Sequence, residues 1–152
     1  MAEKLLIAGV GNIFLGDDGF GVEVAKRLAS RQLPEGVRVE DFGIRGIHLA
    51  FELLEKGYET TILVDATPRG GKPGTVYLIE PELSQLASGP ADAHGMDPAS
   101  VFRMLASLGG TPGRVLIVGC EPASTEEEMG LSEPVAAAVD EAEKLILDLL
   151  RT

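Results

Sequence analysis

Acidic side chains and one histidine stand where short apolar segments end. Asp41 and Asp65 close two such segments, Asp17 and Asp18 lie in the glycine-rich stretch after the first, and His94 lies in a later polar loop. Because open parallel sheets bind ligands at the carboxyl ends of their strands, we expect several of these side chains to meet. Carboxylate oxygens together with an imidazole nitrogen suit a divalent first-row metal. The sequence therefore indicates an oxygen and nitrogen metal site.

Each of these residues also has a purely structural interpretation. Asp17 or Asp18 fits the N-cap of the helix that follows, since aspartate is common there. Asp65 fits a strand-end aspartate that caps a turn, and His94 fits a surface histidine in a loop. Two adjacent aspartates need only one cap, which leaves the other free. We expect Asp17 to be the cap or a supporting residue. We expect His48 to be solvated or to have its hydrogen-bonding groups paired.

Other chemistries are less well supported by the residues present. Cys120 follows a predicted strand and is expected to be a buried structural thiol. No nucleophile-elbow motif and no zinc spacing of the Cys/His kind is present. Gly9 and Gly11 suggest a phosphate-binding loop, but bulky residues follow them, and Asp17 and Asp18 would compete with a phosphate at the helix start. A nucleotide-binding enzyme stays an alternative.

Length and composition set the class of protein. The 152 residues fit one domain, 1–152, and a formal charge of −11 from 13 basic and 24 acidic residues would repel nucleic acids and anionic membranes. A single cysteine allows no internal disulfide, and the start does not read as a signal peptide. We expect a cytoplasmic, monomeric protein that contacts neither nucleic acid nor membrane.

Hydrophobic patterning predicts the elements that position these residues. Short runs rich in valine, isoleucine and leucine predict strands at 4–9, 37–42, 60–65, 75–79 and 114–119. Helical periodicity predicts helices at 19–31, 47–56, 98–108 and 133–150, with Asp97 and Ser132 as N-caps of the last two. This order indicates an α/β three-layer sandwich with a mostly parallel five-stranded sheet flanked by helices. The connection from Asp65 to Thr75 is too short for a crossover, so the 75–79 strand should be antiparallel. The long connection 80–96 is a candidate functional loop.

The motifs, taken in order, resemble one protein family. Gly-Val-Gly-Asn at 9–12 and Gly-Asp-Asp-Gly-Phe-Gly at 16–21 are followed by Asp-Phe-Gly at 41–43, Leu-Val-Asp-Ala at 63–66 and Pro-Gly at 73–74. Asp-Ala-His at 92–94, Gly-Cys-Glu-Pro at 119–122 and Gly-Leu-Ser at 130–132 complete the set. This combination covers essentially the whole chain and resembles the hydrogenase maturation protease family.

The resemblance implies an endopeptidase, of the aspartyl type, that removes the C-terminal extension of a [NiFe] hydrogenase large-subunit precursor after nickel insertion. It implies Asp18, Asp65 and His94 as metal ligands and catalytic residues, with Asp41 at an acidic position linked to function. Many relatives carry glutamate where this chain has Asp18. The nickel is then a recognition element supplied by the precursor, and the site is empty at rest. A non-catalytic nickel-binding maturation chaperone is the alternative.

Overall fold

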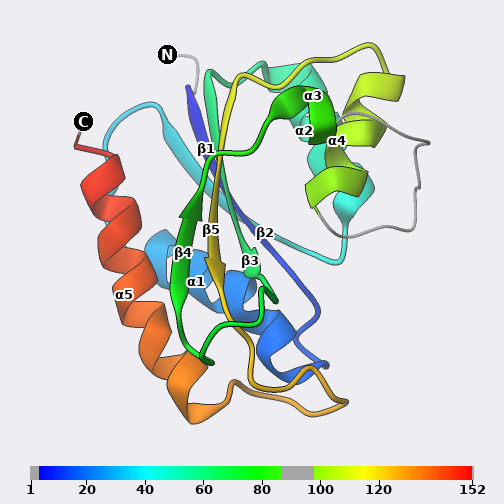
Figure 1. The fold of residues 1–152 in the computed structure, drawn as a ribbon. Coiled ribbons are helices and arrows are strands. Elements are labelled where there is room, and N and C mark those ends of the chain that lie inside the picture. The colour runs from blue at the N-terminus through cyan, green and yellow to red at the C-terminus, as the bar shows by residue number, and fades with distance from the viewer. Residues whose placement is uncertain (1–3, 87–97, 152) are drawn as a thin grey trace.

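The computed structural model describes residues 4–86 and 98–151, which form an α/β fold around one five-stranded sheet (Figure 1). The strands are β1 (Leu5–Val10), β2 (Val37–Gly43), β3 (Thr60–Ala66), β4 (Val76–Ile79) and β5 (Arg114–Cys120). The helices are the 3-10 helix η1 (Gly16–Gly19), α1 (Phe20–Ala29), α2 (Gly46–Lys56), α3 (Leu83–Leu86), α4 (Pro98–Ser107) and α5 (Glu133–Leu149). The strands and the four long helices predicted from the sequence are confirmed, whereas η1 and the short α3 were not predicted.

The strand order in the sheet is β2-β1-β3-β5-β4. β1 pairs in parallel with β2 and β3, and β3 pairs in parallel with β5. β4 pairs with β5 in the antiparallel direction, which confirms the prediction from the short β3–β4 connection. The carboxyl ends of β1, β2, β3 and β5 therefore lie along one edge of the sheet, toward the bottom of Figure 1.

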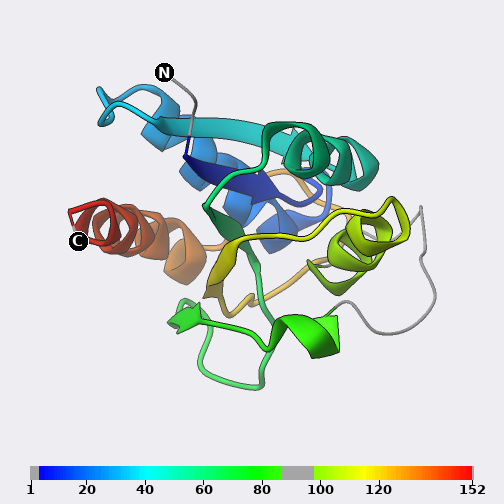
Figure 2. The same cartoon turned by 90° about the horizontal axis from the view of Figure 1, so that it is seen from above.

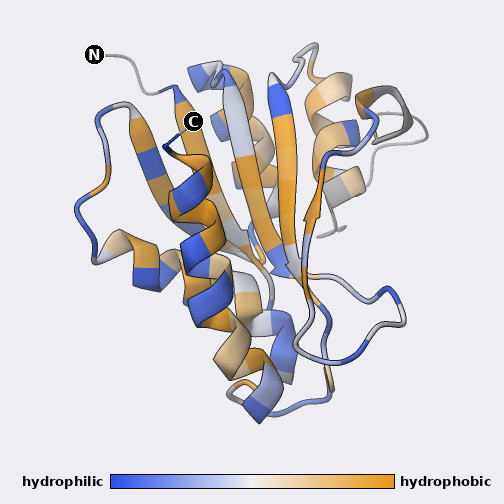
Figure 3. Cartoon of the chain, turned by 60° about the vertical axis from the view of Figure 1, so that its left-hand side comes forward, coloured by the Kyte–Doolittle hydropathy of each residue, from blue (hydrophilic) through white to orange (hydrophobic). Residues whose placement is uncertain are grey.

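Helices cover both faces of the sheet, so the fold has three layers (Figure 2). One buried apolar cluster joins the sheet to α1 and α5, with Phe20 and Ile146 among its members. The other joins the opposite face to α2 and α4 and includes Leu49 and Phe102. β1, β3 and β5 contribute to both clusters, which is why their sequences are apolar on both faces; Figure 3 shows them as largely hydrophobic strands behind a more polar α5. No helix in 4–86 or 98–151 is long and apolar enough to cross a bilayer.

Two glycines allow α1 to pack directly on the sheet. A Cβ on Gly21 would lie 2.0 Å from the carbonyl oxygen of Val64 and 2.5 Å from that of Val10. A Cβ on Gly9 would lie 2.3 Å from the carbonyl oxygen of Gly21. Because no side chain fits in either place, glycine at these positions holds the start of α1 against β1 and β3. This contact places the segment before α1 over the carboxyl ends of the central strands.

Candidate functional site

The strand register brings two of the predicted aspartates to either side of β1. Gly9 in β1 pairs with Asp41 in β2 and, on its other side, with Val64 in β3. Asp65 follows Val64 directly and therefore lies beside the end of β1. Its Oδ1 accepts a hydrogen bond of 2.8 Å from the N–H of Ala66, which orients the carboxylate at the strand end.

Asp18 reaches the same place from η1. Its Oδ2 accepts a hydrogen bond of 2.8 Å from the N–H of Asn12, just beyond β1. Gly11 has a φ of 137°, and a Cβ on it would lie 1.9 Å from the carbonyl oxygen of Asp18 and 3.7 Å from Oδ1 of Asp65. The backbone of Asp18 and the carboxylate of Asp65 thus both lie close to Gly11. Only glycine combines that φ with that close approach.

Asp41, which pairs with Gly9 of β1, is the third aspartate close to the end of that strand. The N–H of Gly11 donates a hydrogen bond of 2.9 Å to the carbonyl oxygen of Gly43, which ties β2 to this point. Oδ1 of Asp41 lies 3.7 Å from the position of a Cβ on Gly43. This oxygen is buried and accepts no hydrogen bond within the described residues. A buried carboxylate oxygen without a partner is costly, which makes Asp41 a candidate for contact with a ligand.

His94, the predicted nitrogen ligand, lies outside the described residues, as does Asp97, the predicted N-cap of α4. Within 4–86 and 98–151, His, Cys, Asp and Glu side chains form no group of three arranged to hold a metal. The described part of the site therefore supplies the carboxylates of Asp18, Asp41 and Asp65, each of which follows or adjoins the end of β1. The ligand set of Asp18, Asp65 and His94 remains a prediction.

Asp17 is not an N-cap, contrary to that interpretation of the sequence. The residue before α1 is Gly19 and the residue before η1 is Leu15, and neither helix has a side-chain cap. The carboxylate of Asp17 is buried and accepts four hydrogen bonds instead. The donors are the N–H groups of Ala123 (2.7 Å), Ser124 (3.1 Å) and Ser132 (2.7 Å) and the hydroxyl of Ser132 (2.9 Å). Asp17 is thus a supporting residue that connects η1 to the loop between β5 and α5.

These hydrogen bonds determine the ionisation of Asp17. Burial raises the pKa of this carboxyl group, but the hydrogen bonds from Ser132, Ala123 and Ser124 outweigh burial and hold it below its usual value. Ser132 precedes α5 with an extended backbone, as an N-cap does, yet its side chain makes no capping hydrogen bond. Its hydroxyl group bonds to Asp17, so the prediction of the position was correct and that of the side-chain cap was wrong.

Glu121 is a buried acidic residue whose role was not predicted. It is 5% exposed, and its Oε1 accepts hydrogen bonds from the N–H groups of Arg69 (2.9 Å) and Gly71 (3.0 Å) and from the hydroxyl of Tyr77 (2.7 Å). These bonds, that of Tyr77 foremost, lower the pKa of Glu121. The carboxylate thereby fixes the loop that follows Asp65. Its position directly after an apolar strand was the only signal in the sequence.

Cys120 and His48 match their structural interpretations. Cys120 is fully buried, and burial raises the pKa of its thiol to about 12, so a thiolate is disfavoured. His48 is exposed on α2. Neither residue belongs to the candidate site.

The contacts of the glycine-rich loop do not suit a phosphate site. Gly9 and Gly21 serve the packing of α1, and the N–H of Asn12 donates to the carboxylate of Asp18. The carboxylate of Asp18 therefore accepts the hydrogen bond of a backbone N–H that a phosphate would need. The nucleotide alternative loses its support.

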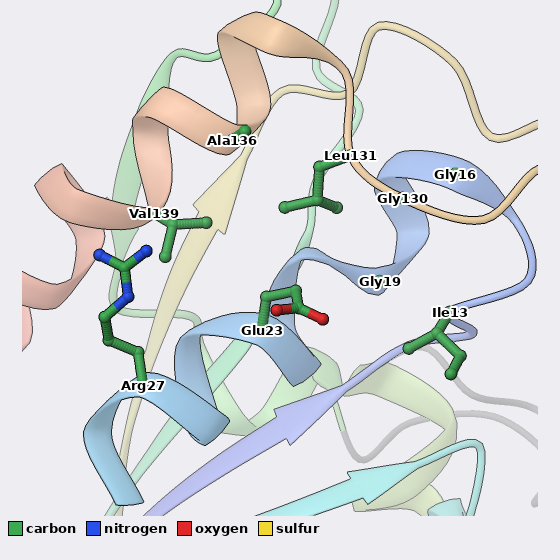
Figure 4. A pocket seen from close by; sticks show the side chains of 9 residues that line it. All are labelled: Ile13, Gly16, Gly19, Glu23, Arg27, Gly130, Leu131, Ala136 and Val139. Atoms are coloured by element: carbon green, nitrogen blue, oxygen red, sulfur yellow. The ribbon is translucent and has the colours of Figure 1, made fainter. Parts of the chain in front are cut away.

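Several cavities adjoin this region. One of about 200 Å³ opens at the site and is lined by Gly11, Asn12, Ile13, Phe14, Val22, Lys26, Asp41, Gly43 and Ile44. Another of about 350 Å³ lies between α1 and α5, where Glu23 and Arg27 face Leu131 and Val139 (Figure 4). The second cavity is lined by none of the three site aspartates, so the first is the one that fits a ligand of the site.

Comparison with known proteins supplies a further finding. Residues 22–149 match the family described as hydrogenase maturation protease. The chain is 37% identical over 149 residues to a protein of Methanocaldococcus jannaschii named as a hydrogenase maturation protease, with 95% of each chain covered. It is 30% identical over 151 residues to the hydrogenase 2 maturation protease of Escherichia coli, covering 97% of this chain and 91% of that one.

Solved structures give the same result. The hydrogenase 2 maturation peptidase of a Thaumarchaeota archaeon superimposes with a TM-score of 0.74 at 36% identity, over 97% of both chains. The hydrogenase maturating endopeptidase HybD of Escherichia coli superimposes with a TM-score of 0.80 at 27% identity, over 97% of this chain and 92% of that one.

Proposed function

Because this chain belongs to the hydrogenase maturation protease family and is a peptide hydrolase, we propose that it removes the C-terminal extension of a [NiFe] hydrogenase large-subunit precursor once nickel is inserted. The observation that carries this proposal beyond the family is that Asp18 and Asp65 both lie close to Gly11, just beyond the end of β1. Both residues lie at the edge of the sheet where such folds bind ligands. The non-catalytic chaperone has no comparable support, since the relatives of this chain include proteins named as maturation proteases.

The nickel in this proposal belongs to the substrate. The residues fit such an ion in kind, because the described part of the site offers carboxylate oxygens and His94 would add an imidazole nitrogen. Asp18 and Asp65 would contact the metal. The buried Oδ1 of Asp41, which has no hydrogen-bond partner among the described residues, would gain a partner from the bound substrate. Nickel would act as a Lewis acid near the scissile bond.

The contribution of the protein is to hold the precursor in place. The N–H of Asn12 orients the carboxylate of Asp18, and the N–H of Ala66 orients that of Asp65. Side chains held in this way lose little conformational freedom when the substrate arrives, so proximity supplies part of the rate. A precursor without nickel would lack the contact that aligns its peptide, and would be cut slowly.

Cleavage of a purified large-subunit precursor, followed by intact mass, tests the proposal. Wild type, Asp18→Asn, Asp65→Asn and His94→Ala would be compared on nickel-loaded and nickel-free precursor, with Asp148→Asn on the exposed surface of α5 as the matched control. We expect a C-terminal mass loss with wild type and control, only with nickel present, and none with the other three variants. Cleavage of nickel-free precursor at the same rate would overturn the nickel requirement. Full cleavage by a folded His94→Ala protein would overturn the ligand set.

A further inference from the structure

The three most exposed large apolar side chains of the described residues gather at one edge of the fold. They are Met129 (63% exposed), Phe14 (60%) and Ile44 (60%), and the next in order is Leu78 at 47%. Phe14 follows β1, Ile44 follows β2, and Met129 lies between β5 and α5. All three loops leave the carboxyl ends of parallel strands, the edge that also carries the candidate site. Large apolar side chains exposed together are typical of interaction surfaces.

The backbone that carries Phe14 and Met129 is held in place by hydrogen bonds. The N–H of Glu128 donates to the carbonyl oxygen of Phe14 (3.0 Å), and the N–H of Gly16 donates to that of Glu128 (2.7 Å). These bonds form a parallel bridge between Leu15 and Glu128, and the two segments run side by side at the bottom of Figure 1. The exposed side chains are therefore presented on an ordered backbone, so little backbone entropy would be lost when a partner binds.

A cavity of about 510 Å³ lies between these side chains. It is lined by Asn12, Phe14, Leu15, Glu127, Glu128 and Met129. Asn12, one of its lining residues, donates its N–H to the carboxylate of Asp18, so the cavity adjoins the site. The lining combines the apolar side chains of Phe14 and Met129 with acidic residues.

The acidic residues at this cavity have no basic partner among the residues that the structure describes. Glu126, Glu127 and Glu128 are exposed, and none forms an ion pair with a residue of 4–86 or 98–151. The whole chain carries a charge of −11. A partner for this cavity must therefore combine apolar side chains with basic ones. A second copy of this chain would bring glutamates against glutamates, and an anionic membrane would be repelled.

We propose that Phe14, Met129, Glu127 and Glu128 form a docking surface for the precursor, and that they receive a segment in which apolar side chains neighbour lysine or arginine. The inference rests on the proposed function and deepens it, because it names the part of the enzyme that selects its protein substrate. Phe14 is the centre of the surface, since it lines both this cavity and the one at Asp41. The carboxylates at the strand ends then act on a peptide that is already anchored.

Two measurements on the full chain test the docking surface separately from catalysis. The first is the dissociation constant for the nickel-loaded precursor, determined with wild type and variants immobilised. The second is the cleavage rate against precursor concentration, which separates KM from kcat. The variants are Phe14→Ala and Glu127→Lys. Phe51→Ala and Glu55→Lys on α2 are the matched controls, because they remove another exposed phenylalanine (41% exposed, against 60% for Phe14) or reverse the same charge elsewhere.

We expect Phe14→Ala to weaken binding and raise KM about ten-fold with kcat unchanged, as the loss of a central aromatic anchor does. Glu127→Lys should weaken binding about five-fold at low salt and less at high salt. The controls should stay within two-fold of wild type. Variants that bind and cleave like the controls would overturn the docking surface while leaving the proposed function intact.

Other outcomes would also test the docking surface and the proposed function. If wild type binds the precursor without cleaving it, the proposed function fails and the dissociation constants still judge the surface. If wild type neither binds nor cleaves, both fail. Concentration-dependent self-association lost in Phe14→Ala would assign the surface to a second copy of the chain and overturn the proposal.

Discussion

The carboxylate of Asp17 accepts two hydrogen bonds from Ser132, one from its N–H at 2.7 Å and one from its hydroxyl at 2.9 Å, although 115 residues separate the two. A third and a fourth come from Ala123 and Ser124. One buried side chain therefore ties the segment that carries Asp18 to the start of α5 and to the loop before it. Two neighbouring aspartates have different roles here, because one faces the interior and the other faces the site.

Asp17→Asn should lower the free energy of unfolding by about 3 kcal/mol, because an amide replaces a charged acceptor and its NH₂ group meets buried donors. Asp18→Asn should lower it by less than about 1 kcal/mol, since it affects a single hydrogen bond. Chemical denaturation of both variants checks this order. Equal stability losses would contradict the distinct roles of the two residues.

The strands could be predicted from the sequence, but the contacts of Asp17 could not. The strands were predictable because segments such as Ile62, Leu63 and Val64 are apolar on both faces, and the antiparallel β4 because the connection before it is short. The convergence of strand-end carboxylates follows from the parallel sheet. The partners of Asp17 were not predictable, because no periodic pattern indicates that the loop before α5 returns to η1.

Long-range polar contacts of this kind also account for Glu121. Its position after a strand did not predict its role: three donors from residues 44 to 52 positions away make it a support for the loop after Asp65. The bridge between Leu15 and Glu128 is a further example. Local sequence patterns determine elements, whereas these contacts depend on how the loops meet once the sheet has formed.

Gly11→Ala should destabilise the fold by about 3 kcal/mol and abolish cleavage. The new Cβ would lie 1.9 Å from a backbone oxygen of Asp18, at a φ of 137° that alanine rarely adopts, so η1 must move away from β1. Gly57→Ala is the matched control. Gly57 also has a positive φ, 62°, but nothing lies within 4 Å of its Cβ position, so about 1 kcal/mol should be lost and cleavage kept. Thermal melts and the cleavage assay measure these effects. A folded Gly11→Ala protein that still cleaved the precursor would contradict the prediction.

Asp41→Asn should reduce cleavage without reducing stability. The Oδ1 of Asp41 is buried without a hydrogen-bond partner among the described residues, so removal of its charge should raise the free energy of unfolding by up to about 1 kcal/mol. The exposed Asp148→Asn control should change stability by less than about 0.5 kcal/mol. A less stable Asp41→Asn protein with normal activity would show that this carboxylate supports the fold instead of the reaction.

Glu121 should make stability depend on pH in acid. Its pKa is lowered in the folded state by Tyr77 and the Arg69 N–H, so the folded protein binds fewer protons than the unfolded chain. This stabilisation is present above the unfolded pKa of about 4.3 and is lost as the pH falls through the lower, folded value. Glu121→Gln should therefore be less stable than wild type at pH 7, and the difference should shrink below about pH 4. Urea titrations at a series of pH values measure it, and a difference that stayed constant down to pH 2 would contradict the lowered pKa.

Cys120→Ala should cleave the precursor at the wild-type rate. The thiol is fully buried, and burial raises its pKa to about 12, so it is neither accessible nor ionised at neutral pH. The substitution leaves a small cavity against β3 and α5 and should lower the free energy of unfolding by about 1–2 kcal/mol. An alkylating thiol reagent should leave the folded wild type unmodified and active, and should modify it fully in denaturant, both followed by intact mass. Loss of cleavage in a folded Cys120→Ala protein would make the thiol the nucleophile and would remove the carboxylates from that part of the mechanism.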